Sequence, residues 1–235
     1  MKTRNRLLEA FGEPALRALS PHLSETSLSL DRILGEAGGA VDYVYFPSSG
    51  VVSMITVLDD GRAVESLTVG HEGAVGLLPA LGAPAWSTRA LVQLAGTAWR
   101  VGARHLREAA QAEPAIVDVA LRYAQATEAH LYQSAACNAL HPIEARLCRW
   151  LLTCEDRVGD SVLPLTQDYL AMMLGVQRTS VTVAAQAVQR RGLMTYRRGR
   201  ITILDRPGLE AAACGCYRTT EAAYAALFAN RGARR

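Results

Sequence analysis

The chain has 235 residues, half of them hydrophobic, and carries a formal net charge of +3 at pH 7. This length predicts two modest domains, and no run of about 20 apolar residues is present to predict a membrane-spanning helix. The N-terminus is polar and lacks the apolar core of a signal peptide. Five scattered cysteines suit a reducing compartment better than a disulfide framework. We therefore expect a cytoplasmic protein with no membrane partner.

Charge is distributed unevenly along the chain. Residues 139–235 contain 14 arginines and 8 acidic residues, a net charge of +6, whereas residues 1–138 contain 11 basic and 14 acidic residues, a net charge of −3. A basic C-terminal part is typical of a nucleic-acid-binding surface.

The first half of the chain has the pattern of helices followed by short strands. Residues 5–23 favour one or two helices. A hairpin is expected from strands 51–58 and 62–69, which are joined by a tight-turn signal, Asp59-Asp60-Gly61. A second pair, residues 90–94 and 97–101, is expected around Ala95-Gly96, and residues 41–46 are also β-rich. Short strands at this spacing predict an antiparallel sandwich or barrel.

A long helix is predicted in the middle of the chain. Pro114 suits a first helical turn, and residues 115–138 contain neither Gly nor Pro. An apolar stripe close to a heptad repeat runs along one side of this helix and predicts a dimer interface. Its members are Val117, Leu121, Ala124, Leu131 and Ala135. A single helix packed on its own β-domain is the alternative, and the stripe is long enough for both contacts. His141-Pro142 then breaks the helix.

The most specific motif begins at Thr166, whose hydroxyl can cap a first helix. Leu170, Met173 and Leu174 give that helix an apolar face, and Gly175 can end it in a left-handed conformation. A second helix is expected from about Arg178 to Arg191. The residues expected on its buried face are Val181, Ala184, Ala185 and Val188.

An arginine-rich hairpin follows this pair of helices. Residues 193–204 read as strand, turn and strand, with three arginines clustered at the tip. Side chains of Arg, Thr and Gln on the exposed face of a recognition helix can contact base edges, and a basic hairpin beside it can contact phosphates. The predicted DNA-binding residues are Thr166, Gln177, Arg178, Thr179, Ser180, Thr182, Gln186, Arg197, Arg198 and Arg200.

The segment LPLTQDYLAMMLGVQRTSVTVAAQAVQRRGLMTYRRGRITILD resembles the winged helix-turn-helix of the Crp/Fnr family of bacterial transcription regulators. The order of the other predicted elements agrees with that family over nearly the whole chain. The resemblance implies an α+β fold: an N-terminal antiparallel β jelly-roll with flanking helices, a long dimerisation helix and a C-terminal winged helix-turn-helix. The corresponding boundaries are residues 1–112 for a cyclic-nucleotide-binding-like sensor domain, 113–140 for the dimerisation helix and hinge, and 141–235 for the DNA-binding domain.

The resemblance also directs attention to a possible effector site. In family members that bind cyclic nucleotides, a Gly-Glu pair and a later Arg hold the ribose and the cyclic phosphate. The counterparts here would be Glu72, Thr88 and Arg89, but the glycines around Glu72 are spaced differently and Arg89 falls about one place out of register. We therefore expect ordinary loop and strand roles for these residues, and a cyclic nucleotide is the weaker of the two interpretations.

Other cofactors of the family have even less support in the sequence. Iron–sulfur members have an N-terminal cysteine cluster, whereas the first cysteine here is Cys137, and the five histidines show no close metal-ligand spacing. No metal site is therefore assigned. Cys148 and Cys154 are expected to pack in a helix. The pair Cys214 and Cys216 leaves a metal or redox role open beside the alternative of two incidental cysteines in a C-terminal helix.

The predicted function is a sequence-specific transcription regulator that acts as a homodimer on palindromic double-stranded DNA, with RNA polymerase as a further partner implied by the resemblance. No catalytic set is present, so an enzyme is not expected. The alternative is a ligand-binding β-barrel or an interaction module with an accessory helical domain. Well-known family members have a Glu where this chain has Thr179, and Val183 replaces a later Arg. The operator should therefore differ from the family's best-known palindrome.

Overall fold

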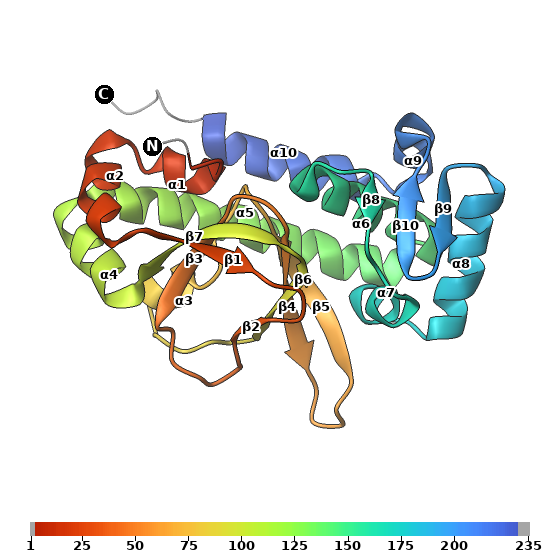
Figure 1. Cartoon of the computed structure of the whole chain (residues 1–235), viewed down its shortest axis with the longest axis horizontal. Helices are drawn as coiled ribbons and strands as arrows, with labels where there is room; N and C mark the ends of the chain where they lie inside the picture. The colour runs from red at the N-terminus through yellow and green to blue at the C-terminus, as the bar shows by residue number, and fades with distance from the viewer. Residues whose placement is uncertain (1–2, 230–235) are drawn as a thin grey trace.

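The computed structural model describes residues 3–229 of the chain. Its N-terminal part is an antiparallel domain of two sheets (Figure 1). Helices α1 (Arg6–Ala10) and α2 (Glu13–Leu19) and the short helix η1 (Ser20–His22) precede it. One sheet has the strand order β1-β7-β3 and the other the order β2-β6-β4-β5. The strands are β1 (Ser24–Leu28), β2 (Ile33–Gly35), β3 (Tyr43–Pro47), β4 (Val51–Val57), β5 (Ala63–Val69), β6 (Arg89–Leu94) and β7 (Gly96–Gly102).

The first predicted hairpin is confirmed. Strands β4 and β5 pair antiparallel, with Val52 opposite Val69 and Val57 opposite Ala63. Gly61 in the turn between them has a φ of +83°, which a residue without a Cβ adopts at little cost.

The prediction that residues 90–94 and 97–101 form a hairpin is wrong. Strand β6 pairs with β2 and β4, whereas β7 pairs with β1 and β3 in the other sheet. The chain passes between the two sheets at Ala95-Gly96 instead of turning back. Gly96 is required there because a Cβ at this position would lie 2.3 Å from the carbonyl oxygen of Ser49.

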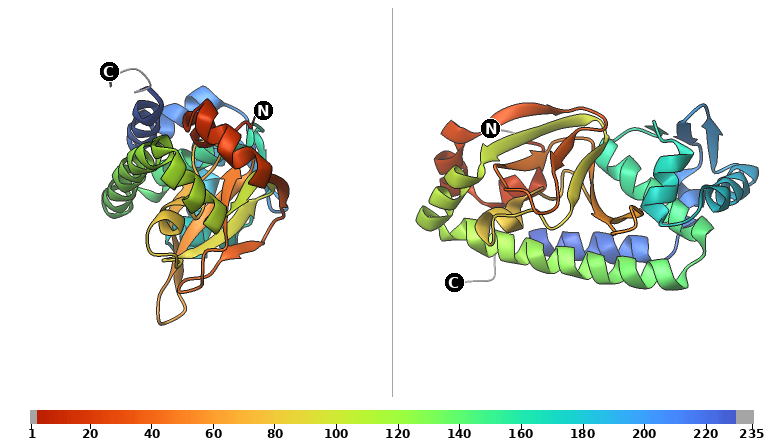
Figure 2. Two further views of the ribbon diagram at one scale, coloured as in Figure 1. Left: turned by 90° about the vertical axis from the view of Figure 1, so that its left-hand side faces the viewer. Right: turned by 90° about the horizontal axis from the view of Figure 1, so that it is seen from below.

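Helices pack on the N-terminal domain, and one of them connects it to the C-terminal part. Helix α3 (Leu77–Leu81) packs beside α4 (Ala103–Ala112), and α5 (Pro114–Leu140) is the long helix that the sequence predicts. Helix α10 (Cys216–Ala229) runs back along α5 toward the N-terminal domain (Figure 2). None of the described helices is long and apolar enough to cross a membrane.

The C-terminal part has the predicted winged helix-turn-helix arrangement. Its elements are α6 (Ile143–Val158), β8 (Val162–Leu163), α7 (Gln167–Leu174), α8 (Arg178–Arg190), β9 (Met194–Arg197), β10 (Arg200–Ile203) and α9 (Arg206–Ala212). Strands β9 and β10 form the predicted hairpin, and β8 completes a three-stranded sheet. Helix α8 and this hairpin occupy the end of the molecule opposite α2 and α4 (Figure 1).

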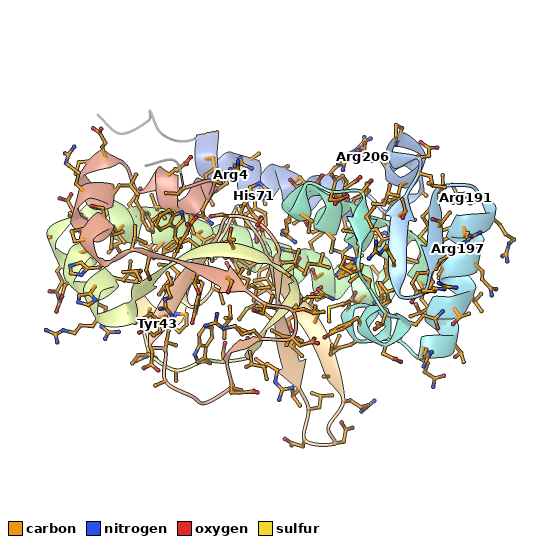
Figure 3. The ribbon with its side chains drawn as sticks, viewed as in Figure 1. Arg4, Tyr43, His71, Arg191, Arg197 and Arg206 are labelled. Atoms are coloured by element: carbon orange, nitrogen blue, oxygen red, sulfur yellow. The ribbon has the colours of Figure 1, made fainter. Side chains whose placement is uncertain are left out.

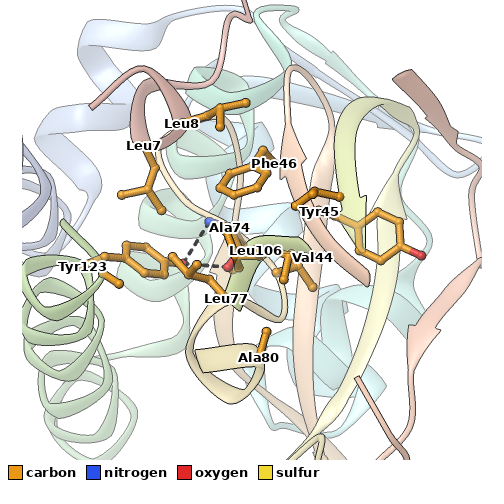
Figure 4. Close-up of a cluster of buried hydrophobic side chains, with 14 of the residues drawn as sticks. Leu7, Leu8, Val44, Tyr45, Phe46, Ala74, Leu77, Ala80, Leu106 and Tyr123 are labelled. Carbon is orange, nitrogen blue, oxygen red and sulfur yellow. Dashed lines mark hydrogen bonds between the residues drawn. The ribbon is translucent and has the colours of Figure 1, made fainter. Parts of the chain in front are cut away.

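Two buried apolar cores hold the fold together. The first lies within the N-terminal domain and includes Leu7, Phe46, Leu77 and Leu106 (Figure 4). Helix α5 closes it, and the hydroxyl of Tyr123 donates to the carbonyl oxygen of Ala74 at 3.1 Å.

The second core belongs to the helix-turn-helix part but extends into the β-domain. Val51, Ile55 and Leu94, from strands β4 and β6, are buried in it. The helix-turn-helix part is therefore packed directly on one sheet of its own N-terminal domain.

Candidate nucleic-acid interface

Helix α7 begins and ends as its sequence predicts. The Thr166 hydroxyl accepts a hydrogen bond from the backbone N–H of Tyr169 at 3.3 Å, which satisfies one of the free donors of the first turn. Gly175 ends the helix in the left-handed region with a φ of +61°. Leu170, Met173 and Leu174 are buried, as expected.

Helix α8 crosses α7 and presents its opposite face to solvent. The four residues expected on its inner side, Val181, Ala184, Ala185 and Val188, are all buried. They pack against α6 and α7, which hold α8 in place from behind. The outer face is consequently free to enter a groove of suitable width.

The residues predicted to contact DNA lie at the N-cap of α7, along α8 and its N-cap, and on the hairpin. Eight of them are exposed, namely Thr166, Gln177, Arg178, Thr179, Gln186, Arg197, Arg198 and Arg200. Ser180 and Thr182 are half-buried. The structure thus brings the predicted residues of helix and hairpin to one end of the molecule, where Arg197 is marked in Figure 3.

Two polar side chains of α8 have partners that restrict their orientation. Arg178 donates through Nε to Oε1 of Gln167 at 3.3 Å, and its Nη1 lies 3.4 Å from Oδ1 of Asp168. Both Arg178 and Asp168 are largely exposed, so this ion pair is weak and can exchange for a stronger contact. Oε1 of Gln189 accepts from the backbone N–H of Tyr196 at 2.8 Å, which fixes the hairpin to α8.

Two consecutive residues with positive φ form the turn at the tip of the hairpin and position its arginines. Arg198 and Gly199 both have positive φ, +50° and +72°, and connect the paired residues Arg197 and Arg200. This tight turn keeps the three arginines together at the end of the hairpin, a concentration of charge suited to phosphates.

Val183 adds an apolar contact surface that the predicted DNA-binding set omits. It lies on the outer face of α8 and is 65% exposed, flanked along the helix by Thr179 and Gln186. An exposed methyl-bearing side chain on a recognition helix can contact the 5-methyl group of thymine. The signal was in the sequence, since Val183 falls on the helical face opposite Val181 and Ala184.

In the β-domain, Glu72 is buried in an ion pair with Arg157 of α6. Arg157 Nη2 lies 2.7 Å and Nε 2.9 Å from Glu72 Oε1. Burial opposes ionisation of Glu72, but the charge and hydrogen bonds of Arg157 more than offset it and hold the pKa of Glu72 below its usual value. The carboxylate therefore connects the β-domain to the helix-turn-helix part.

A second carboxylate, the half-buried Glu65, lies across the same boundary. Glu65 accepts from Trp150 Nε1 at 2.9 Å and from the Ser53 hydroxyl at 2.5 Å. Its burial raises its pKa. Together with the Glu72 pair, these contacts fix α6 against the sheet that contains β4 and β5.

A partly open cavity of about 240 Å³ lies between the β-domain and α5. Thr88 is among its lining residues, together with Trp86, Tyr123 and Leu131, whereas Glu72 and Arg89 are not. Arg89 instead donates to both carboxylate oxygens of Glu36 at 2.9–3.0 Å on the surface.

The cavity does not match a cyclic nucleotide. Such a ligand needs a cation for its phosphate and an acceptor for its ribose. Among the described residues that line the cavity none is charged, and the two charged candidates are each paired elsewhere.

Helix α5 has one buried and one exposed face. Ile116, Val119 and Tyr123 are buried against the rest of the chain. Of the predicted interface residues, Val117, Leu121, Leu131 and Ala135 are exposed and Ala124 is half-buried. Leu121 is 64% exposed, and Tyr132, three turns further along the helix, extends the same exposed surface.

Residues 145–212 match the family model of the Crp-like helix-turn-helix domain. This part of the chain is therefore a Crp-like helix-turn-helix domain. The match covers α6 to α9 and stops before α10. No curated protein matches the chain at a significant level.

Solved structures share the fold of nearly the whole chain. FixK2 from Bradyrhizobium japonicum is 17% identical with a TM-score of 0.70, over 82% of this chain and 98% of that one. A transcriptional regulator of the Crp/Fnr family from Eubacterium rectale is 17% identical with a TM-score of 0.65, over 86% and 94%. A CRP-family transcriptional regulator from Thermus thermophilus is 20% identical with a TM-score of 0.64, over 80% and 96%. The chain thus has the domain and the fold of Crp/Fnr-type transcription regulators, which confirms the resemblance seen in its sequence.

Proposed function

We propose that this protein is a sequence-specific DNA-binding transcription regulator that acts as a homodimer on a palindromic site. The observation that carries the proposal is the exposed face of α8, where Arg178, Thr179 and Gln186 lie beside an arginine-rich hairpin. The helix would enter the major groove while the hairpin contacts phosphates. Such a regulator acts where chromosomal DNA lies, in the cytoplasm, and RNA polymerase is its natural further partner.

Dimerisation follows from the geometry of DNA recognition and from helix α5. One helix-turn-helix reads only a half-site, so two copies related by a two-fold axis are needed for a palindrome. The exposed apolar stripe of α5 supplies a self-complementary surface for this contact. We keep the division into residues 1–112, 113–140 and 141–235 as the functional one, with α5 as the element shared by both copies.

Any effector of the β-domain should be small and uncharged. The cavity of about 240 Å³ is lined mainly by apolar side chains, and it adjoins α5 through Tyr123, Thr127 and Leu131. A ligand there would act on the helix that we assign to the dimer. We therefore propose an uncharged ligand in place of a cyclic nucleotide, whose phosphate would have no charged partner among the residues lining the cavity.

The decisive experiment is selection of binding sites from random DNA, followed by gel shifts of the selected palindrome at several salt concentrations. Binding should weaken with salt, because arginine–phosphate contacts release counterions. The selected half-site should differ from the family's best-known one, because Thr179 and Val183 replace the side chains that read it. Absent or salt-independent binding would refute the proposal.

Arg178→Ala tests the role of α8 directly. Loss of a bidentate contact to guanine should weaken specific binding by about 1–3 kcal/mol and relax the preference at one position of each half-site. The matched control is Arg104→Ala, since Arg104 is also a largely exposed arginine but lies on α4. An interaction module that does not read DNA would show no difference between the two variants.

A further inference from the structure

Four metal-ligating side chains converge at the junction of α5 and α10. One ligand atom from each of Cys137, His141, Cys214 and Cys216 lies within 4.8 Å of all the others. The Sγ atoms of Cys137 and Cys214 are 3.5 Å apart, and Cys216 Sγ is 3.4 Å from His141 Nδ1. The three cysteines are buried, whereas His141 is exposed.

Local structure explains how each pair is presented. Cys137 lies in the last turn of α5, and His141 is the C-cap, whose backbone N–H donates to the carbonyl oxygen of Cys137 at 3.0 Å and so keeps the two residues adjacent. Cys214 and Cys216 flank Gly215, where the chain turns from α9 into α10. The spacing among the five histidines alone does not indicate a metal site. The relevant sequence signal is the mixed pair Cys137 and His141, which are four positions apart.

We propose that Cys137, His141, Cys214 and Cys216 bind one zinc ion in a structural site. Zinc takes four ligands in a tetrahedron, with sulfur at about 2.3 Å and nitrogen at about 2.0–2.1 Å. Neighbouring ligand atoms of such a tetrahedron are about 3.5–3.8 Å apart. The two separations of 3.5 Å and 3.4 Å are close to this size, and the other separations are within 4.8 Å, so small side-chain movements would complete the tetrahedron. Four protein ligands leave no open position, which is the mark of a structural and not a catalytic site.

The surroundings suit thiolate ligands. Gln133 Nε2 donates to Cys216 Sγ at 2.9 Å, a hydrogen bond of the kind that orients a metal-bound sulfur. The guanidinium of Arg149 adds positive charge near Cys137 and Cys214. Ala145 packs against the cysteines and shields them from solvent.

The position of the site gives it a mechanical role. Cys137 and His141 precede the Crp-like domain, residues 145–212, and Cys214 and Cys216 follow it. One ion would therefore join the two chain ends of the DNA-binding domain to each other. It would also fix the start of α10, which then packs along α5 through Tyr224 and His130.

A disulfide between Cys137 and Cys214 is the competing interpretation, because their sulfurs are close together. It would leave the approach of Cys216 and His141 to the same point unexplained. The two interpretations also differ in mass and in metal content, so one set of measurements separates them.

The test measures zinc in the full-length protein purified without chelators. Elemental analysis and native mass spectrometry should find about one zinc ion per chain. Cys216→Ala should lose it, whereas Cys148→Ala should retain it, because Cys148 is a buried cysteine in a different core. Cobalt substituted into the wild-type protein should give the visible spectrum of a tetrahedral thiolate site, a result that does not depend on any variant folding.

Two outcomes would overturn the proposal. One is zinc-free protein that takes up neither zinc nor cobalt when reduced. The other is a mass about 2 Da lower with two thiols missing, which identifies the disulfide. Metal content is measured without DNA, so its outcome is independent of whether the protein binds an operator.

Discussion

At the scale of single residues, His130 is a buried titratable group at the contact of α5 with α10. It is 3% exposed, and its Nδ1 lies 3.3 Å from the hydroxyl of Tyr224. Burial, together with the positive charges of Arg157 and Arg149, lowers the pKa of His130 to about 3. The folded protein therefore holds this imidazole neutral at every pH near neutrality.

This lowered pKa predicts that stability falls as the pH falls below about 6.5, the usual pKa of an unfolded-state histidine. In that range the unfolded chain binds a proton that the folded chain does not, so the free energy of unfolding should drop by about 2 kcal/mol between pH 8 and pH 5 from this group. Urea titrations at several pH values measure the drop. His130→Asn should remove it, and an unchanged pH dependence in the variant would contradict the burial argument.

At the scale of elements, the turn between α7 and α8 is in contact with the β4–β5 hairpin. Gly175 has a φ of +61°, and a Cβ added to it would lie 2.9 Å from Cγ2 of Val64 on β5. Gly192, at the end of α8, has a φ of +74° but nothing within 4 Å of such a Cβ. The two glycines thus share a backbone conformation and differ in their surroundings.

The comparison gives a matched pair of substitutions. Gly192→Ala should cost about 1–2 kcal/mol, the strain of a left-handed alanine. Gly175→Ala should cost more, because Val64 is stiff and must move. Adding Val64→Ala to Gly175→Ala should recover the excess. Urea denaturation measures the loss of unfolding free energy in each variant. Equal losses for Gly175→Ala and Gly192→Ala would show that Val64 does not restrict the space at Gly175.

At the scale of the whole molecule, each chain exposes an apolar helix face that a second copy can cover. Leu121 is the most exposed large side chain of the predicted stripe. Leu121→Glu should weaken dimerisation about a hundredfold, or about 3 kcal/mol, because a symmetric contact would bury two carboxylates. Sedimentation velocity over a range of concentrations measures this change.

The control for the dimer is Leu30→Glu, since Leu30 is an exposed leucine outside α5. This variant should dimerise as the wild type does. If both variants stayed dimeric at the same concentrations, the two-fold axis would have to lie elsewhere on the molecule.

The whole molecule also shows how the helix-turn-helix part is fixed to the β-domain. Its core takes in Val51, Ile55 and Leu94 from the β-domain, and the Glu72–Arg157 pair crosses the same boundary. Removing one member of a buried ion pair leaves a charge without compensation, so these contacts resist separation. Any effector-driven movement of the helix-turn-helix would have to break them.

Much of the helix-turn-helix could be predicted from the sequence because its signals are local. The cap at Thr166, the left-handed Gly175 and the buried face around Val181 depend on residues within one or two helical turns of each other. The same holds for the β4–β5 hairpin, whose turn sequence lies between its two strands.

Only the tertiary structure decided what depends on distant segments. Strands β6 and β7 are neighbours in sequence but belong to different sheets. Glu72 finds its partner 85 residues away, and Cys137 meets Cys214 at a separation of 77. Hydrophobic periodicity determines which face of an element is buried, but not which other element covers it. The sequence therefore determined the helix-turn-helix and its arginine-rich hairpin, whereas the paired Glu72, the uncharged cavity and the four-residue cluster depend on how the chain folds back on itself.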